Sequence, residues 1–383
     1  MPLHIDQINI YSLHVPFKRD FSISYETLDG SKPVVVEVLA NEGKIKGYGE
    51  GLPVKEVTGE KPQTVTQAVA SFVAQDAFPS QIENVDQIFS FVESLPEKKE
   101  VSAAICSLES ALLDAIGRYQ KKTITEYFSK DFWTDIIYYG APIPLSDEET
   151  LIQVCAMIKK LGLTHLRVKA GADLEQNEAS LRAIRSILAH NCEVRVDPNQ
   201  AWDIELAYNH LPILEKYDVE VLEEPMPPDT PGFSGFARAT LEAGIKLMAC
   251  ESAPTFQEVM RIVEQGLFQM INVKLTRSGG LTRSLKTIQY LRRKGISFQI
   301  GCSRGETGIL SAAGRALGLL CRDAVYIDGS YDAFLLKENT TSQDVSFGFG
   351  GEAGPLPGHG LGVEVDPQQL RKLCFSFHEI PIT

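Results

Sequence analysis

The sequence predicts an α/β protein in which a parallel barrel of alternating strands and helices follows an α+β domain. From about residue 136, short apolar segments alternate with helix-length amphipathic segments, giving eight strand candidates separated by seven helix candidates. Strands connected through helices form right-handed parallel units, and eight strands of this kind close into a barrel. The strand candidates have apolar interiors, as expected for strands that are buried on both faces.

The barrel elements are short and regularly spaced. The strand candidates are residues 137–145, 165–171, 193–199, 219–225, 245–251, 269–275, 297–303 and 324–330. The helix candidates are residues 147–162, 177–190, 207–217, 233–244, 255–266, 283–295 and 308–321.

The first 130 residues have a different pattern. Two β-rich runs, 4–17 and 31–53, are broken by Gly-containing turns and predict an antiparallel meander or hairpin. Residues 63–75 and 101–120 have apolar residues at i, i+3 and i+4 and predict helices. We therefore divide the chain into an α+β domain (1–130), the barrel (131–340) and a Gly- and Pro-rich tail (341–383) that returns to the first domain.

Composition excludes several classes of partner. The net charge of −13 argues against nucleic acid, which requires clustered Lys and Arg. No apolar run reaches the roughly 18 residues that span a bilayer, and the N-terminus lacks the features of a signal peptide. The seven cysteines have no CxxC spacing, which indicates free thiols in a reducing cytoplasm. We expect a cytoplasmic protein that binds neither nucleic acid nor membrane.

Residues that can perform chemistry gather at the ends of the strand candidates, where the active site of a βα barrel lies. Acids end three successive strands, and such carboxylates repel one another unless a cation neutralises them. Hard oxygen ligands in this number suit Mg²⁺. The alternative is that each acid caps a helix or pairs with a surface lysine. The strand-end residues are Arg167, Lys169, Asp197, Asn199, Glu223, Glu224, Cys250, Glu251, Lys274, Ser303, Glu306 and Asp328.

Two lysines flank the acids from opposite sides. Lys169 ends the second strand candidate and Lys274 the sixth. A metal ion and the neighbouring Arg167 would lower the pKa of a lysine at this place and make it a usable base. Two bases on opposite faces of a carbanion would remove a proton from one side and return it from the other. The alternative is that each lysine pairs with an acid.

The order of these residues resembles the enolase superfamily, and specifically its muconate-lactonizing-enzyme subgroup. The resemblance rests on Lys169, Asp197-Pro-Asn199, Glu223-Glu-Pro225, Glu251-Ser252 and the segment INVKLTRSGGL, and also on GYGEGLP and GLGVEVD near the two ends. It implies a modified TIM barrel of the (β/α)₇β type, with an α+β capping domain built from the N-terminal segment and the C-terminal tail. It further implies Mg²⁺-assisted abstraction of a proton α to a carboxylate.

Within this subgroup, the segments VTGEKPQTV and CSLESALLDAIGR look most similar to dipeptide epimerases. The resemblance implies racemisation or epimerisation of a dipeptide or N-acyl amino acid through an enediolate. Lys169 and Lys274 would be the acid/base pair, with Asp197 and Glu223 as metal ligands and Arg167 and Asn199 in support. Cycloisomerisation and β-elimination are the alternatives, because the same two lysines can serve each.

The chain departs from the family pattern at three positions. Arg167 stands where the family has a lysine, and Ser330 stands at the second acidic position of the eighth strand. Cys250 occupies the place of the third metal ligand. A thiolate suits Mg²⁺ poorly, so either Glu251 replaces Cys250, or the site uses Mn²⁺ or Zn²⁺, or it binds metal weakly. A metal-deficient, non-catalytic homologue is therefore a further alternative.

The expected partner is a small carboxylate substrate, held by residues of the seventh and eighth strands and of the capping domain. Glu306 and Asp328 are candidates for binding a substrate ammonium, and Ser303 is a further contact. Lys18 and Arg19, in a loop expected to close over the barrel, are candidates for a second substrate carboxylate. Solvated surface charge is the other interpretation of these two. Assembly, as a monomer or homo-oligomer, stays open.

A remote alternative is a serine hydrolase. Gly301-Cys302-Ser303-Arg304-Gly305 matches the G-x-S-x-G nucleophile motif after a strand and before a helix. Asp328 and His359 would complete the hydrolase order of Ser, Asp and His. This interpretation leaves the lysines and acids of the other strands unexplained.

Overall fold

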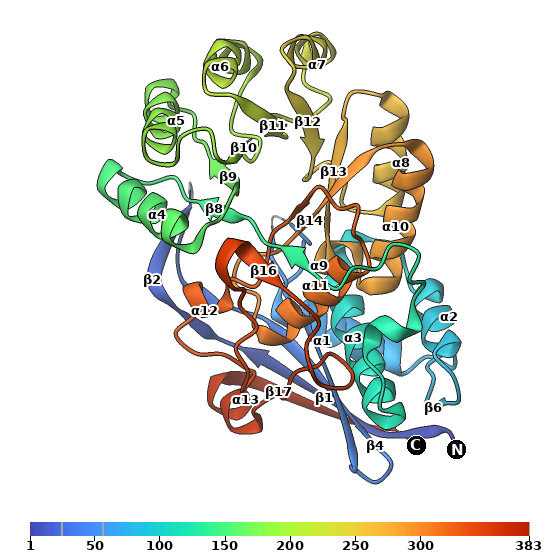
Figure 1. Cartoon of the computed structure of the whole chain (residues 1–383). Helices are drawn as coiled ribbons and strands as arrows, with labels where there is room; N and C mark the ends of the chain where they lie inside the picture. The colour runs from blue at the N-terminus through green and yellow to red at the C-terminus, as the bar shows by residue number, and fades with distance from the viewer. Residues whose placement is uncertain (24–25, 56, 383) are drawn as a thin grey trace.

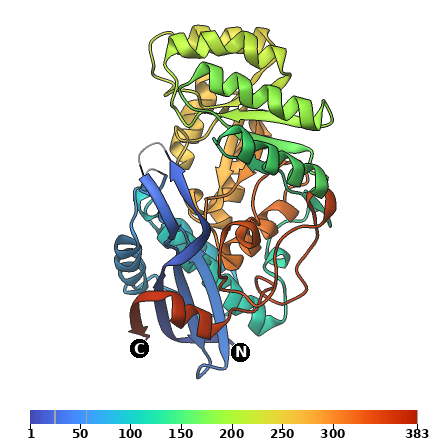
Figure 2. The ribbon, with the colours of Figure 1, turned by 90° about the vertical axis from the view of Figure 1, so that its left-hand side faces the viewer.

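A computed structural model of the chain describes residues 1–23, 26–55 and 57–382, with only the backbone of residues 19–23 and 26–28. A parallel barrel surrounded by helices lies on one side of the molecule, and a domain built around an antiparallel sheet lies on the other (Figures 1 and 2). We call this second part the capping domain. No helix among the described residues is both long enough and apolar enough to span a membrane.

The capping domain combines five strands with three helices and a separate hairpin. Its main sheet has the order β17-β1-β4-β5, with β6 paired to β1, and all of these pairs are antiparallel. Strands β2 and β3 form the hairpin. The elements are β1 (Leu3–Leu13), β2 (Val15–Ile23), β3 (Glu26–Ser31), β4 (Val34–Ala40), β5 (Ile45–Gly51), α1 (Pro62–Val73), β6 (Gln81–Ile82), α2 (Asp86–Ser94), α3 (Ser102–Gln120) and β17 (Cys374–Pro381).

The glycines of β5 allow α3 to lie directly on the sheet. Gly47, Gly49 and Gly51 alternate along the strand and so share one face. A Cβ atom at these three positions would lie 2.0 to 2.3 Å from carbonyl oxygens of α3. Helix α3 is therefore enclosed along most of its length, and its residues 102–117 are all buried. The opposite face of β5 carries Tyr48 and Glu50, both of which are also buried.

The barrel strands form one parallel sheet in sequence order, β8 to β15. A parallel bridge between Tyr139 and Ile327 brings the first and last strands together. The strands are β8 (Ala141–Ile143), β9 (His165–Lys169), β10 (Glu193–Asp197), β11 (Val219–Glu223), β12 (Lys246–Ala249), β13 (Met270–Lys274), β14 (Ser297–Gly301) and β15 (Tyr326–Ile327). The helices between them are α4 (Glu148–Leu161), α5 (Leu174–Leu188), α6 (Ile204–Lys216), α7 (Phe233–Glu242), α8 (Phe256–Gln265), α9 (Leu275–Ser278), α10 (Leu281–Lys294) and α11 (Gly308–Leu319).

The last part of the chain crosses back to the first domain. After α12 (Asp332–Leu335), strand β16 (Glu352–Ala353) pairs with β7 (Ile137–Tyr138), and α13 (Pro367–Leu373) leads into β17. Strand β17 pairs with β1 and so adds the edge strand of the capping sheet. The predicted fold class, a modified TIM barrel with a capping domain completed by the C-terminal tail, is confirmed.

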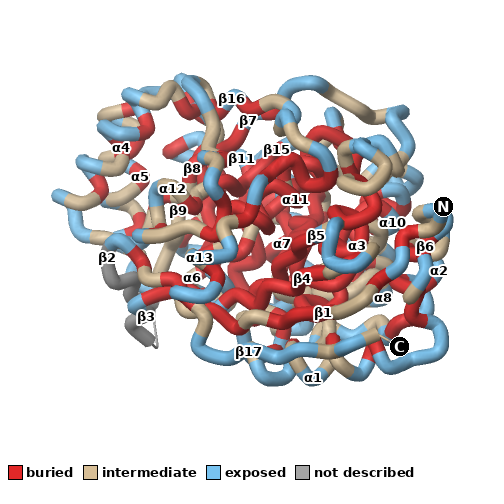
Figure 3. The backbone as a smooth tube through the Cα atoms, turned by 90° about the horizontal axis from the view of Figure 1, so that it is seen from below, coloured by how far each residue is buried: buried red, intermediate tan, exposed pale blue. Residues whose placement is uncertain are grey.

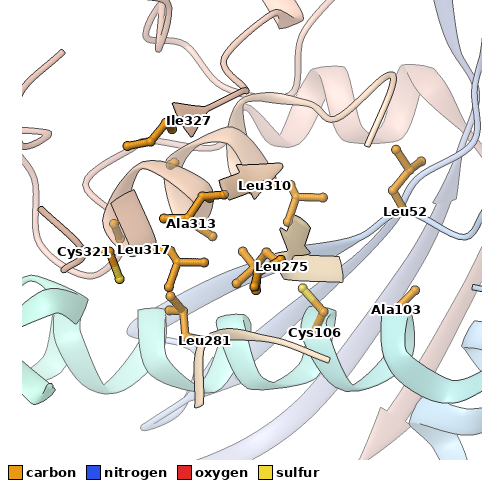
Figure 4. Close-up of a cluster of buried hydrophobic side chains, with 14 of the residues drawn as sticks. Leu52, Ala103, Cys106, Leu275, Leu281, Leu310, Ala313, Leu317, Cys321 and Ile327 are labelled. Carbon is orange, nitrogen blue, oxygen red and sulfur yellow. The ribbon is translucent and has the colours of Figure 1, made fainter. Parts of the chain in front are cut away.

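One hydrophobic cluster joins the two domains. The cluster contains residues of the capping strands and of the barrel strands and helices, and Figure 3 shows buried segments in both parts. In Figure 4, Cys106 of α3 lies beside Leu275 of α9, and Leu310 of α11 lies above Leu275. Two buried carboxylates of the capping domain also cap barrel helices. Glu50 accepts hydrogen bonds from the amides of Thr307 (2.9 Å) and Leu310 (3.0 Å), and Glu109 from those of Leu281 and Thr282. The domains therefore form one packed body.

The strands are shorter than the sequence pattern predicts. The eighth strand has two residues where residues 324–330 were expected, and β12 ends at Ala249, so Cys250 and Glu251 lie in the loop that follows. Two helices begin earlier than predicted because an aspartate caps each of them. Asp173 accepts a hydrogen bond from Gln176 N, and Asp203 from Leu206 N, which starts α5 and α6 three residues before the predicted bounds.

Candidate active site

Strands β9 to β13 bring the predicted residues to one end of the barrel. The two lysines end β9 and β13, and the three strands between them carry the acids and Cys250. Asp197 ends β10, Glu223 ends β11, and Cys250 follows β12 directly. The side chains turn into the barrel because alternate residues of a strand face the same way.

Lys169 is held by two oxygen atoms. Its Nζ donates to Asp197 Oδ2 at 2.5 Å and to Asn199 Oδ1 at 2.5 Å. The Lys169 side chain is 29% exposed, whereas that of Asp197 is 1% exposed, so the lysine reaches the open end of the barrel and the aspartate does not. Burial raises the pKa of Asp197, but the charges of Lys169 and Arg167 outweigh it and hold the pKa below its ordinary value.

Arg167 links Asp197 to Asp328. Its Nη1 lies 3.5 Å from Asp197 Oδ2, and its Nε lies 3.2 Å from Asp328 Oδ2. Asp328 is fully enclosed and also pairs with Arg195, whose Nη2 lies 3.0 Å from Asp328 Oδ1. Burial raises the pKa of Asp328, but the two guanidinium groups bring it below its ordinary value. Asp328 is predicted to bind a substrate ammonium, and in this structure its carboxylate is paired with two arginines.

Glu223 keeps one carboxylate oxygen without a partner. Its Oε1 accepts from Asn272 Nδ2 at 2.7 Å, while Oε2 is buried and has no hydrogen-bond partner. Burial, with a contribution from the charge of Asp197, raises the pKa of Glu223. A buried carboxylate oxygen without a partner is costly, and a bound cation is one way to satisfy it.

The Cys250 thiol points toward Arg277. Arg277 Nη1 lies 3.1 Å from Cys250 Sγ and 2.7 Å from the Cys250 carbonyl oxygen, and Asn272 Nδ2 lies 3.7 Å from the sulfur. Burial raises the pKa of the thiol far above its ordinary value, and the charge of Glu251 adds to this. The thiol is therefore protonated at neutral pH, and a protonated thiol is a poor nucleophile.

Glu251 turns toward Asn199, which also accepts a hydrogen bond from Lys169. Asn199 Nδ2 donates to Glu251 Oε1 at 2.9 Å, and Glu251 Oε2 is buried without a partner. The adjacent acid Glu224 has a different role, because it accepts hydrogen bonds from the amides of Cys250 (2.5 Å) and Ser252 (2.9 Å) and so holds this loop in place. Of the two acids that end β11, Glu223 faces the barrel interior and Glu224 organises the loop.

Lys274 is more deeply placed than Lys169. It is 8% exposed. Burial lowers the pKa of its ammonium group, but the ionisable groups around it, Cys250, Glu223 and Glu251, raise it above its ordinary value. Because the thiol is protonated at neutral pH, we attribute the increase to the two carboxylates. The protein groups alone therefore do not give the lowered lysine pKa that the sequence predicts.

The loop after β14 carries Ser303 and Glu306. The Ser303 amide donates to Glu306 Oε1 at 2.5 Å, and burial raises the pKa of Glu306 to about 8. The base of the hairpin β2–β3 covers this loop, since a Cβ at Gly305 would lie 2.5 Å from Ser31 Oγ. The predicted contact Arg19 and most of the expected closing loop lie outside the described side chains. Lys18 Nζ donates to the carbonyl oxygen of Ala333 at 2.5 Å.

The arrangement does not form the serine-hydrolase triad. The Asp328 carboxylate accepts from Arg195 and from Gln299 Nε2 at 3.2 Å, and no histidine is among its described partners. His359 is exposed. The next residue, Gly360, is hydrogen-bonded to the backbone of Lys122 and Ile124, just after the end of α3. The Ser303 motif is thus explained by the turn into α11.

No three His, Cys, Asp or Glu side chains among the described residues converge closely enough to be a formed metal site. The donor atoms nevertheless suit a hard cation. Two buried carboxylate oxygens, Glu223 Oε2 and Glu251 Oε2, lack partners, as does Asn272 Oδ1. Carboxylate and amide oxygens are the preferred ligands of Mg²⁺. The residues present therefore fit a divalent cation.

Three residues around the site were not anticipated from the sequence: Arg195, Asn272 and Arg277. Arg195 and Asn272 lie two residues before Asp197 and Lys274, so each faces the interior one level below. That spacing alone would have identified both. Arg277 lies in the short helix α9, whose turn back toward β12 has no signal in the sequence.

Two family models match the chain. Residues 149–369 match the enolase C-terminal domain-like family, and residues 7–128 match the mandelate racemase / muconate lactonizing enzyme N-terminal domain. The chain therefore belongs to the enolase superfamily, in the muconate-lactonizing-enzyme subgroup, and the resemblance inferred from the sequence is confirmed.

Particular relatives extend this assignment. A hydrophobic dipeptide epimerase of Enterococcus faecalis is 26% identical over 369 residues, covering 95% of this chain and 96% of its own. The solved structure of N-succinyl Arg/Lys racemase from Bacillus cereus has a TM-score of 0.85 at 20% identity, covering 98% of this chain and 100% of its own. The dipeptide epimerase from Enterococcus faecalis complexed with Mg and the dipeptide L-Leu-L-Tyr has a TM-score of 0.83 at 24% identity, covering 94% and 99%.

Proposed function

We propose that the protein is an isomerase that epimerises or racemises a dipeptide or N-acyl amino acid by moving the proton α to a carboxylate. The observation that carries the proposal is the placement of Lys169 and Lys274 on either side of the three strands that bear the acids. A substrate carbon held between these strands would present one face to each lysine. One lysine removes the proton and the other delivers a proton to the opposite face.

The two lysines differ in how they are held. Lys169 donates to Asp197 and Asn199, which aim its Nζ at the open end of the barrel. Lys274 lies among Glu223, Glu251 and Cys250 with little exposure to water. Enclosure limits the access of bulk water to this side of the site, so that Lys274 is the group placed to transfer a proton there.

The residues that would hold a divalent cation are Asp197, Glu223 and Glu251. We choose Glu251 over Cys250 because the sulfur is engaged by Arg277, whereas Glu251 Oε2 is buried and unpartnered. We propose Mg²⁺, which is the metal named for the Enterococcus faecalis epimerase structure. Bound there, it supplies positive charge against the negative charge that develops on the substrate carboxylate.

Other features support the substrate class and the surroundings. Relatives that the chain matches over most of its length are named as epimerases or racemases of dipeptides and N-succinyl amino acids. We propose a cytoplasmic location because all seven cysteines are free thiols.

The deciding experiment is isotope exchange. The enzyme, supplied with Mg²⁺, is incubated in deuterated water with a library of dipeptides and N-acyl amino acids. Deuterium should enter the α-carbon of both recovered substrate and product, which mass spectrometry and NMR measure. A Lys169→Ala, Lys274→Ala double variant is the control and should show no exchange. Absence of exchange across the whole library would overturn the proposal, while loss of water or ring closure without epimerisation would point to the elimination or cycloisomerase alternative.

A further inference from the structure

A line of alternating charges runs from the barrel interior up to Lys169. It begins at Arg195, continues through Asp328, Arg167 and Asp197, and ends at the lysine. Arg195 and Asp328 have no exposed side-chain surface, and Arg167 is 9% exposed. Charges enclosed in this way interact strongly because water does not screen them.

Arg195 holds Asp328 with both ends of its guanidinium fork. Its Nη2 lies 3.0 Å from Oδ1, and its Nη1 lies 3.4 Å from Oδ2. Gln299 accepts from the same Nη1 and donates to Asp328 Oδ2 at 3.2 Å. The ring of Tyr326 lies 4.3 Å from the Arg195 guanidinium carbon. These contacts fix the Asp328 carboxylate in one orientation.

Arg167 sits between two carboxylates and is shared by them. Its Nε faces Asp328 at 3.2 Å, and its Nη1 faces Asp197 Oδ2 at 3.5 Å. That same Oδ2 accepts from Lys169 Nζ at 2.5 Å. If Asp328 lost Arg195, Arg167 would be the guanidinium that remains beside it, together with the neutral donors Gln299 and Tyr331. The guanidinium would then move toward Asp328 and away from the oxygen that holds the lysine.

We propose that Arg195 is a positioning residue for Lys169: by sharing the charge of Asp328 it keeps Arg167 against Asp197 and so holds the Lys169 ammonium at the mouth of the barrel. Arg195 touches neither lysine. None of the described hydrogen bonds or ion pairs connects Arg195 to Lys274, whose strand β13 lies three strands further along the sheet from β10. Replacing Arg195 should therefore slow proton transfer on the substrate face that Lys169 serves and leave proton transfer on the face of Lys274 nearly unchanged.

The test compares Arg195→Met with two further variants. Asp328→Asn removes the charge of the central group with little change in shape, and remains informative if Arg195→Met does not fold. Tyr326→Phe is the matched control, since it keeps the ring over Arg195 and alters only the hydroxyl, which lies 3.5 Å from Glu220 Oε2. Crystal structures of the variants give the first readout. In Arg195→Met the separation of Arg167 and Asp328 should shorten, and that of Arg167 and Asp197 should lengthen.

Deuterium exchange gives the second readout and rests on the proposed function. The single lysine-to-alanine variants first identify which epimer each lysine deprotonates. Arg195→Met should slow the exchange started by Lys169 at least tenfold and change that started by Lys274 less than threefold. Asp328→Asn removes the charge that competes with Asp197 for Arg167, so it should shorten the separation of Arg167 and Asp197 and slow the exchange started by Lys169 less than threefold. Tyr326→Phe should leave both exchanges unchanged. Equal loss on both faces, or Arg167 unmoved in the variant structures, would overturn the inference. If the native enzyme exchanged no substrate, the proposed function would fail, and the variant structures would still decide the role of Arg195.

Discussion

Arg277 Nη1 lies 3.1 Å from Cys250 Sγ, at the position where relatives of this subgroup are expected to place a metal-binding aspartate. The same guanidinium donates to the carbonyl oxygens of Cys250 and Asn272. The sulfur is thus part of a contact between β12 and α9. Because Arg277 engages the sulfur, the neighbouring Glu251 is the better candidate for the third metal ligand.

The first prediction concerns metal affinity. Glu251→Gln should weaken Mn²⁺ binding at least tenfold, about 1.4 kcal/mol, because it removes the charge beside the unpartnered oxygen. Cys250→Ala should change the affinity less than threefold, since the sulfur is held by Arg277. Calorimetry and the electron paramagnetic resonance of Mn²⁺ measure both. The opposite ranking would make Cys250 the ligand.

The second prediction separates the lysines. Lys169→Ala and Lys274→Ala should each lower the interconversion of epimers by roughly 10²–10⁴-fold, the range expected for loss of a general acid or base. Each variant should keep α-proton exchange for one epimer only, and the retained epimer should differ between the two. Chiral chromatography and NMR in deuterated water give these rates. A variant that exchanged both epimers would show that its lysine is not in the proton path.

The third prediction is a pH dependence of stability that arises at Glu60. This carboxylate caps α3 through the amides of Ala103 (2.8 Å) and Ala104 (3.2 Å), and burial raises its pKa from 4.5 to about 7. The folded protein then binds more protons than the unfolded chain between these two values, so stability is lost as the pH rises from about 4.5 through 7.

Glu60→Gln should remove this part of the pH dependence. The difference between the native protein and the variant in unfolding free energy should change by at most about 3 kcal/mol between pH 4.5 and 7.5. Urea unfolding at several pH values measures it. A difference that stayed constant over this range would show that Glu60 has an ordinary pKa in the folded protein.

The fourth prediction concerns the contact between α3 and α10. Gly280 has φ +100°, and a Cβ there would lie 1.8 Å from Glu109 Oε2, the group that caps α10. Gly280→Ala should therefore destabilise the protein by at least about 2 kcal/mol more than Gly244→Ala, whose φ is +78° but whose Cβ would meet nothing within 4 Å. Thermal unfolding compares the two. Similar losses would mean that backbone strain, and not the lost cap, is the main cost.

The sequence predicted the architecture well because the apolar period of each element is local information. The alternation of strand and helix from residue 136 and the order of strand-end residues were sufficient for the barrel and for the placement of Lys169, Asp197, Glu223 and Lys274 at one end. The contacts that a side chain makes across the fold are not local information. Asp328 looked available for a substrate ammonium, yet the fold gives it two arginines, one of them from the level below.

The contacts of two acids that are adjacent in sequence, Glu223 and Glu224, could not be predicted for the same reason. Glu223 and Glu224 are adjacent in sequence, but one faces the interior and the other binds the amides of the next loop. Glu224 has φ +33°, a backbone conformation that its residue type does not predict. Likewise, the roles of Cys250 and Glu251 could not be separated before the position of Arg277 was known.

The strand β5 restricts how this protein can be rebuilt. Its glycine face admits α3 at backbone contact, and Glu50 on its other face caps α11 of the barrel. A chimera that exchanged the whole capping domain with that of a relative would have to match α3, α10 and α11 at once. The hairpin β2–β3 belongs to neither of these contacts. The main capping sheet and α3 are thus tied to the barrel and would have to be exchanged together with it.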